Sequence, residues 1–109
     1  MATIDEFSAI DMRVGMIVDV EEHAAARKPM YKLTVDFGAE IGKRTIVAGI
    51  RSLYSMEELL NRKIVCVVNL EPKSIAGVES QGMLLAAGDE SNISILVPYR
   101  DIEIGSRVR

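Results

Sequence analysis

The sequence is poor in the residues that form disulfides and common metal sites. Among its 109 residues it has one cysteine, one histidine and no tryptophan. A single cysteine excludes a disulfide framework and a cysteine metal cluster within one chain. Because Cys66 lies inside an apolar run, we expect a small buried core residue rather than a nucleophile. His23 has neither a cysteine nor a second histidine to complete a metal site, so we expect an exposed loop residue.

Long apolar runs are missing as well. No stretch approaches the ~20 apolar residues of a membrane helix, and the acidic N-terminus lacks the basic and apolar regions of a signal peptide. These absences predict a cytosolic protein without membrane association. The sequence also has no phosphate-cradling loop, nucleophile elbow or zinc-protease motif. We therefore predict that the protein is not an enzyme and that it needs neither a cofactor nor a metal.

The overall charge counts against a nucleic-acid partner without excluding one. The formal net charge is −3, whereas dedicated nucleic-acid binders are usually basic. A local patch matters more than the total, and lysines and arginines cluster in residues 27–32, 43–44 and 62–63. Nearly half of the residues are hydrophobic, which is enough for one mainly aliphatic core. We expect residues 1–109 to form a single domain.

Alternating apolar and polar residues, together with one nearly continuous apolar run, predict strands through most of the chain. The predicted strands are residues 13–21, 31–37, 44–48, 63–70, 83–87 and 93–97. Capping boxes predict two short helices, one beginning after Thr3 and one running from Ser55 through Leu60. Asn61 suits the left-handed end of the second helix.

This order of elements predicts an all-β fold. We expect a five-stranded OB-fold Greek-key barrel with a short helix after its third strand, a short N-terminal helix and C-terminal extension strands. Such a barrel binds oligonucleotides on the face of its second and third strands. A β-sandwich is the alternative, but it would not need the mid-chain helix.

Residues 68–87 are the most informative part of the sequence, because a polar loop there separates two apolar strands. The loop and the strand after it carry an amide, a cation, a hydroxyl and a thioether, on Asn69, Lys73, Ser80 and Met83. Each has a structural explanation: a turn amide, a solubilising charge, a turn hydroxyl and a core filler. Together they also fit RNA recognition, in which the amide bonds a base edge or ribose, the charge and hydroxyl bind phosphate or sugar, and the thioether supports a base.

Four further cations are candidates for phosphate contacts. Lys32 lies in a strand on the face opposite to its apolar residues, so it points outward if those residues form the core. Lys28, Arg44 and Arg51 lie nearby in the sequence. A solvated face explains all four equally well, and spacing alone does not decide between the two interpretations.

At these residues the chain resembles the tRNA-binding domain family. The motifs that carry the resemblance are Asp11-Met12-Arg13-Val14-Gly15, Ala26-Arg27-Lys28-Pro29, Tyr31-Lys32-Leu33, Asp36-Phe37-Gly38, Ala48-Gly49-Ile50-Arg51, Asn69-Leu70-Glu71-Pro72-Lys73 and Ser80-Gln81-Gly82-Met83. Any one of these strings is weak, but their order and spacing are highly specific and cover almost the whole chain. Residues 69–73 and 82–87 look most like the C-terminal appendage of methionyl-tRNA synthetases. Residues 27–32 look more like the export-related, chaperone-like members.

The resemblance implies an OB barrel that binds the outside corner of tRNA by its shape. It also implies a homodimer, since members of the family often pair through the N-terminal segment and the C-terminal third. We predict a non-catalytic tRNA-binding protein, a dimeric stand-alone version of the appendage that assists a methionyl-tRNA synthetase. The predicted RNA contacts are Lys28, Lys32, Arg44, Arg51, Asn69, Lys73, Ser80 and Met83. The alternatives are a protein-interaction module with little RNA binding and, with no clustered acid–base set to support it, a small enzyme.

Overall fold

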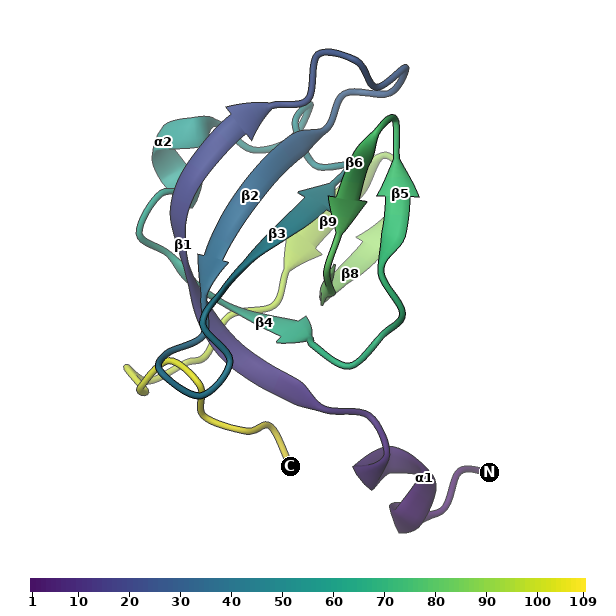
Figure 1. The fold of residues 1–109 in the computed structure, drawn as a ribbon, viewed down its shortest axis with the longest axis vertical. Coiled ribbons are helices and arrows are strands. Elements are labelled where there is room, and N and C mark those ends of the chain that lie inside the picture. Colours follow the sequence, from purple (N-terminus) through teal and green to yellow (C-terminus); the bar gives the residue numbers. More distant parts are fainter.

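The computed structural model describes residues Met1–Arg109, which form a β-barrel with two short helices (Figure 1). The elements are α1 (Ile4–Ser8), β1 (Met12–Glu22), β2 (Tyr31–Asp36), β3 (Lys43–Ala48), α2 (Met56–Leu59), β4 (Lys63–Val67), β5 (Lys73–Ile75), β6 (Val78–Ser80), β7 (Met83–Leu84), β8 (Ala86–Asp89) and β9 (Asn92–Ile95). Both predicted capping boxes are present, with Thr3 and Ser55 as the N-cap residues. Asn61 has the expected left-handed backbone, with a φ of 66°.

The barrel is built on an antiparallel sheet of five strands in the order β3-β2-β1-β4-β7. The segment before β7 returns to β3 and nearly closes the barrel. There the Gln81 amide nitrogen donates to the Thr45 carbonyl oxygen at 2.8 Å, and the Gln81 side-chain oxygen accepts from the Thr45 amide at 3.0 Å. This is the predicted OB-like strand order, and α2 follows the third strand as expected.

The interior holds a cluster of 14 buried residues, most of them aliphatic. Phe37, Leu33 and Ile17 are completely buried. A register shift between Ile17 and Asp19 marks a β-bulge in β1, which bends a strand so that its two halves can serve different partners. Gly15 packs directly against this core, and an added Cβ there would come within 2.6 Å of Phe37 and Val35 side-chain atoms. The barrel can close around Phe37 only because this position has no side chain.

The structure differs from the predicted strands between residues 68 and 97. β4 ends at Val67 rather than at residue 70, and the predicted strand 83–87 is split into β7 and β8. The polar loop also contains an unpredicted hairpin, β5–β6, whose two turn residues Ala76 and Gly77 have positive φ values of 48° and 86°. A turn of this handedness matches the twist of the strands that it joins. The sequence pattern missed the hairpin because each strand has only three residues.

The same hairpin makes the prediction for His23 wrong. His23 is buried rather than exposed, and its Nε2 lies 2.7 Å from the carbonyl oxygen of Ile75 in β5. Figure 1 shows the β5–β6 hairpin beside the loop that joins β1 to β2. The hairpin therefore contacts the start of this loop at His23, while most of the loop stays exposed.

The C-terminal extension runs beside the first half of β1. Gly105 donates to the Val14 carbonyl at 2.7 Å, and Val14 donates to the Ser106 carbonyl at 2.9 Å. We expected strands in this C-terminal extension. The structure instead has an extended segment with one isolated bridge, between Arg13 and Arg107. No helix in the structure has the length and apolar character to cross a membrane.

Candidate nucleic-acid interface

A groove of about 550 Å³ opens on the outer side of β3, under the β5–β6 hairpin. Its walls are formed by Val47, Leu70, Glu71, Lys73, Ile75, Ser80, Gly82 and Met83. The fold thus brings together three side chains that the sequence singled out, Lys73, Ser80 and Met83. Leu70, Val47 and Ile75 give the groove an apolar floor that could accept the face of a base.

The three predicted residues contribute to the groove in different ways. Lys73 is exposed on β5 and forms no ion pair. Met83 is 48% exposed, so its thioether is available as an apolar surface and does not fill the core. Ser80 is buried; its Oγ accepts from the Val47 amide at 2.9 Å and donates to the Gly82 carbonyl at 3.3 Å. The Ser80 hydroxyl therefore fixes the groove wall and leaves contacts with a ligand to its neighbours.

Lys32 extends this groove across the sheet. It pairs in register with Val47 of β3, and opposite residues of an antiparallel pair share a face. Because Val47 lines the groove, Lys32 lies on the same outer face, as predicted from the alternation in β2. Its Nζ is 3.1 Å from a carboxylate oxygen of Glu21 on β1.

A second basic site lies at the end of the barrel, in the loop that joins β1 to β2. A shallow hollow of about 270 Å³ there is lined by Arg27, Lys28, Arg51 and Ser52, among others. Three cations and a hydroxyl around one hollow suit a phosphate. Arg51 also pairs with Glu22, with 3.3 Å between Nη2 and Oε2. The structure thus groups Lys28 with Arg51, as the predicted surface requires.

Asn69 and Arg44 line neither hollow, and their side chains bond to backbone next to the groove. The Asn69 amide accepts from the Asp11 nitrogen and donates to the Ala9 carbonyl, both at 2.8 Å. Arg44 donates to the carbonyls of Val68 and, at 3.4 Å, Gln81. These bonds fix the end of β4 against the N-terminal segment and against the closing segment. The structure therefore favours a positioning role for both side chains over direct contact with RNA.

The prediction missed the apolar lining of the groove, Val47, Leu70 and Ile75. Val47 offered only a weak signal: it is an apolar residue among polar ones on the outer face of β3, and single apolar residues on a surface are common. The other two offered none, since their positions depend on the hairpin.

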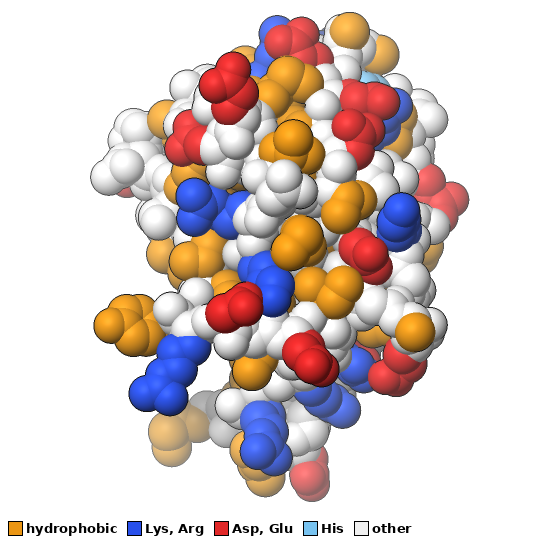
Figure 2. All heavy atoms as spheres, turned by 90° about the vertical axis from the view of Figure 1, so that its left-hand side faces the viewer, with side chains coloured by type: hydrophobic (Ala, Val, Ile, Leu, Met, Phe, Trp, Pro, Cys, Tyr) orange, Lys and Arg blue, Asp and Glu red, His pale blue; other side chains and the backbone are white.

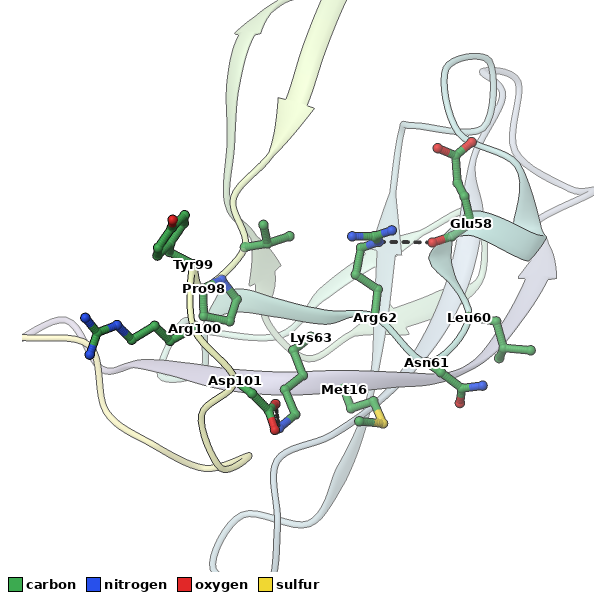
Figure 3. A pocket seen from close by; sticks show the side chains of 11 residues that line it. Met16, Glu58, Leu60, Asn61, Arg62, Lys63, Pro98, Tyr99, Arg100 and Asp101 are labelled. Carbon is green, nitrogen blue, oxygen red and sulfur yellow. Dashed lines mark hydrogen bonds and ion pairs between the residues drawn. The ribbon is translucent and has the colours of Figure 1, made fainter.

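Another hollow of about 410 Å³, here called the second hollow to distinguish it from the loop hollow, lies between α2, the start of β4 and residues 97–101 (Figure 3). Two of its three cations have partners within the chain: Lys63 Nζ lies 2.7 Å from Asp101 Oδ1, and Arg62 Nε donates to the Glu58 carbonyl at 3.1 Å, whereas Arg100 is exposed and forms no ion pair. Tyr99 is fully exposed and projects away from Arg62 in Figure 3. The side of the molecule with α2 and β1 mixes apolar side chains with charges of both signs (Figure 2).

The one cysteine is enclosed in the core. Burial raises the pKa of the Cys66 thiol to about 12, so the thiol stays protonated at neutral pH. The predicted core role of Cys66 is confirmed by its complete burial. No three His, Cys, Asp or Glu side chains converge where they could hold a metal ion.

Comparison with known proteins gives a consistent result. Residues 12–107 match the model of a family described as "Putative tRNA binding domain". The chain is 51% identical over 107 residues to a methionine–tRNA ligase of Pyrococcus furiosus, a match that covers 98% of this chain and 14% of the ligase. A methionine–tRNA ligase of Methanococcus maripaludis is 49% identical over 105 residues, covering 96% of this chain and 15% of the ligase. The chain therefore spans about one seventh of the length of these curated relatives.

Solved structures also match over the full length of the chain. A CsaA chaperone protein from Picrophilus torridus superimposes with a TM-score of 0.93 at 39% identity, covering 100% of both chains. A MetRS-related protein from Pyrococcus horikoshii superimposes with a TM-score of 0.89 at 40% identity, covering 100% of this chain and 98% of the other. The same barrel thus occurs as a separate chain and within a synthetase.

Proposed function

Since this chain belongs to the tRNA-binding domain family, we propose that it binds tRNA by shape, without catalysing a reaction, on the outer face of β2 and β3. The observation that carries the proposal is the groove beside β3, which combines an apolar lining with Lys73 and lies next to Lys32. A stacking surface bordered by cations is how proteins hold unpaired nucleotides. In an OB barrel this face is the usual oligonucleotide site.

In the proposed complex the two basic sites act together. The groove holds a splayed base or sugar against Met83, with Lys73 and Lys32 on the adjoining phosphates. The loop hollow with Lys28 and Arg51 holds a phosphate farther along the backbone. Most RNA recognition of this kind depends on shape and backbone contacts, since A-form helices hide their base edges.

Asn69, Arg44 and Ser80 support this surface indirectly. Their polar groups bond to backbone within the protein. We assign them to keeping β4, β6 and β7 in the arrangement that forms the groove. Substituting them should reduce RNA affinity together with stability, whereas substituting Lys32 should reduce affinity alone.

We further propose that the chain acts in the cytoplasm as an appendage that assists a methionyl-tRNA synthetase. The support is that the curated relatives carry this stretch as about one seventh of a methionine–tRNA ligase. A barrel that binds tRNA weakly and without sequence preference would raise the local concentration of tRNA near a catalytic body. Adding the purified chain to a synthetase lacking such a domain should lower the KM for tRNA and leave kcat unchanged.

The proposed unit is a homodimer. Large apolar side chains stay exposed on the N-terminal segment and along the C-terminal third, the two regions through which we expect pairing. They are Ile4, Phe7, Ile10, Leu96, Val97, Tyr99 and Ile102. Two copies would present two RNA surfaces to one tRNA, which raises avidity without any new contact.

Fluorescence anisotropy tests the RNA proposal directly. The probes are whole tRNA, an unstructured RNA of equal length and a plain RNA duplex, each titrated over a salt series. We expect tRNA to bind more tightly than the other two. With about four phosphates neutralised, log K should fall with log salt at a slope between about −2.8 and −3.6. Equal affinity for all three probes would remove the shape-reading role, and no binding at low salt would remove RNA binding altogether.

A protein-interaction module is the second candidate. It is favoured by the exposed apolar residues around the second hollow and by the structural match to a protein described as a CsaA chaperone. It predicts that the purified chain suppresses aggregation of an unfolded model protein and retains no RNA. Lys32→Ala separates the two candidates, since it should weaken RNA binding and leave the suppression of aggregation unchanged; Tyr99 does not separate them, because it also lies in the proposed dimer face.

A further inference from the structure

Two of the cations on the proposed RNA surface are already neutralised by the protein itself. Lys32 pairs with Glu21 at 3.1 Å and Arg51 pairs with Glu22 at 3.3 Å. By contrast, Lys28 and Lys73 take part in no ion pair. Arg27, beside Lys28 in the loop hollow, is unpaired as well, so an RNA that approaches this surface meets three free cations and two that it must share with a carboxylate.

The fold itself holds these carboxylates in place. Glu21 and Lys32 are register partners across β1 and β2, so the sheet puts their side chains on one face. Glu22 is the last residue of β1, and its carboxylate reaches Arg51 in the segment after β3. Glu21 thus lies beside the cation next to the groove, and Glu22 lies beside the arginine of the loop hollow.

Both pairs are exposed enough for a phosphate to exchange with the carboxylate. The side chains of Lys32 and Glu21 are 37% and 55% exposed, and those of Arg51 and Glu22 are 37% and 54% exposed. Ion pairs at such sites are weak, so they do not lock the cations. The displaced carboxylate nevertheless remains close to the incoming phosphate and repels it. Each shared cation therefore attracts RNA less than a free one.

We propose that Glu21 and Glu22 set the affinity and the selectivity of the RNA surface by competing with phosphates for Lys32 and Arg51. The inference rests on the proposed RNA binding. The competition lowers the attraction that any polyanion gains, while the apolar contacts with Met83 in the groove are untouched. At a given protein concentration, an RNA that offers only phosphates stays free, and one that also fills the groove binds.

The competition also gives the acidic character of the chain a role. A net charge of −3 is unusual for an RNA-binding protein. With Glu21 and Glu22 placed against the two cations, part of that negative charge suppresses non-specific binding to nucleic acid. Affinity is then concentrated in the groove and in the free cations.

The test compares two double variants that change the net charge equally. Glu21→Gln with Glu22→Gln frees the two cations, and Glu57→Gln with Glu103→Gln makes the same charge change on exposed residues of α2 and the C-terminal segment. Each variant and the wild-type protein are titrated with tRNA and with a plain RNA duplex over a salt series. Urea unfolding of all three proteins reports on the fold.

We expect the Glu21/Glu22 variant to bind both RNAs about three- to twentyfold more tightly than the wild-type protein. Its salt slope should be steeper by about 0.7–0.9 for each contact that is freed. The Glu57/Glu103 variant should change affinity by less than about twofold, because neither residue pairs with a cation of the surface and salt screens exposed charges. At a concentration where the wild-type protein retains only tRNA, the Glu21/Glu22 variant should retain the duplex as well.

The outcomes separate this inference from the proposed function. If the wild-type protein binds tRNA and both double variants behave alike, the competition is refuted while RNA binding stands. If neither the wild-type protein nor the Glu21/Glu22 variant binds any RNA at low salt, the proposed function fails and the inference falls with it.

Discussion

The groove face and the second hollow of this barrel contain similar residue types but use them differently. On the groove face, Lys73 has no ion-pair partner, and Lys32 pairs only with the exposed carboxylate of Glu21. Both lysines are therefore available to an anion. At the second hollow, the Lys63 side chain is only 20% exposed and is held by Asp101 and the Ile102 carbonyl, while Tyr99 and Arg100 are exposed. The groove face therefore presents accessible cations beside an apolar lining, whereas the second hollow presents an exposed aromatic ring and one free arginine around a largely buried lysine. The comparison shows that the number of cations matters less than which of them can exchange partners.

The substitution with the largest expected effect removes a core residue on which both faces depend. Phe37 is completely buried and packs against the position of Gly15. Phe37→Ala should lower the free energy of unfolding by about 3–5 kcal/mol, because it removes a large ring and leaves a cavity. Urea unfolding measures the loss, and Phe37→Leu, which keeps most of the volume, is the matched control. RNA binding and self-association should decline in parallel in the alanine variant. A barrel that keeps its stability would mean that Phe37 is not central to the core.

The second prediction concerns the apolar face alone. Tyr99→Ala should weaken self-association by about 2 kcal/mol or more, since exposed aromatic residues commonly dominate an interface. Stability measured per chain should change little, because the Tyr99 side chain makes no buried contact within the chain. Sedimentation equilibrium measures the association, and Tyr99→Phe is the control that keeps the ring. Dimers of unchanged strength in Tyr99→Ala would place the interface elsewhere.

The sequence predicted the barrel well because its strands before residue 68 have clear physical signals. Residues 31–37 alternate without a break, and both helices begin with a capping box that the structure contains. Such signals are local, so they can be recognised in the sequence without knowledge of the tertiary structure. The β5–β6 hairpin was missed because three-residue strands have too few positions to show a period.

The candidate site was harder to predict than the fold, for a related reason. The sequence shows which residues are polar but not what they bond to. Asn69 and Ser80 were predicted to contact RNA, and their partners lie 58 and 33 residues away, at Asp11 and Val47. Lys32 was easier to place, because its outward direction follows from the alternation of β2. Long-range hydrogen bonds, rather than residue type, decide which of these side chains stay free.

The third prediction concerns the groove face. Lys32→Ala should weaken binding of all tRNAs alike by about 1 kcal/mol and make the salt slope shallower by about 0.7–0.9, because one phosphate contact is lost. Part of the loss comes from Glu21, which is left unpaired beside the RNA. Lys32→Ala with Glu21→Gln should therefore recover some affinity. Arg100→Ala, which removes an equal charge at the second hollow, is the control. An unchanged salt slope in Lys32→Ala would refute the phosphate contact.

The smallest expected effect sharpens the comparison by stabilising the groove face alone. Ala76 has a left-handed backbone with a φ of 48° in the turn of β5–β6, a conformation that asparagine tolerates better than alanine. Ala76→Asn should raise the free energy of unfolding by about 0.5 kcal/mol. Hydrogen exchange should slow in β5 and β6, and self-association should stay the same. Because Ile75 and Ser80 of this hairpin line the groove, a firmer hairpin should also raise tRNA affinity slightly. Slower exchange without any gain in affinity would mean that the hairpin is already fully ordered when the free protein meets RNA.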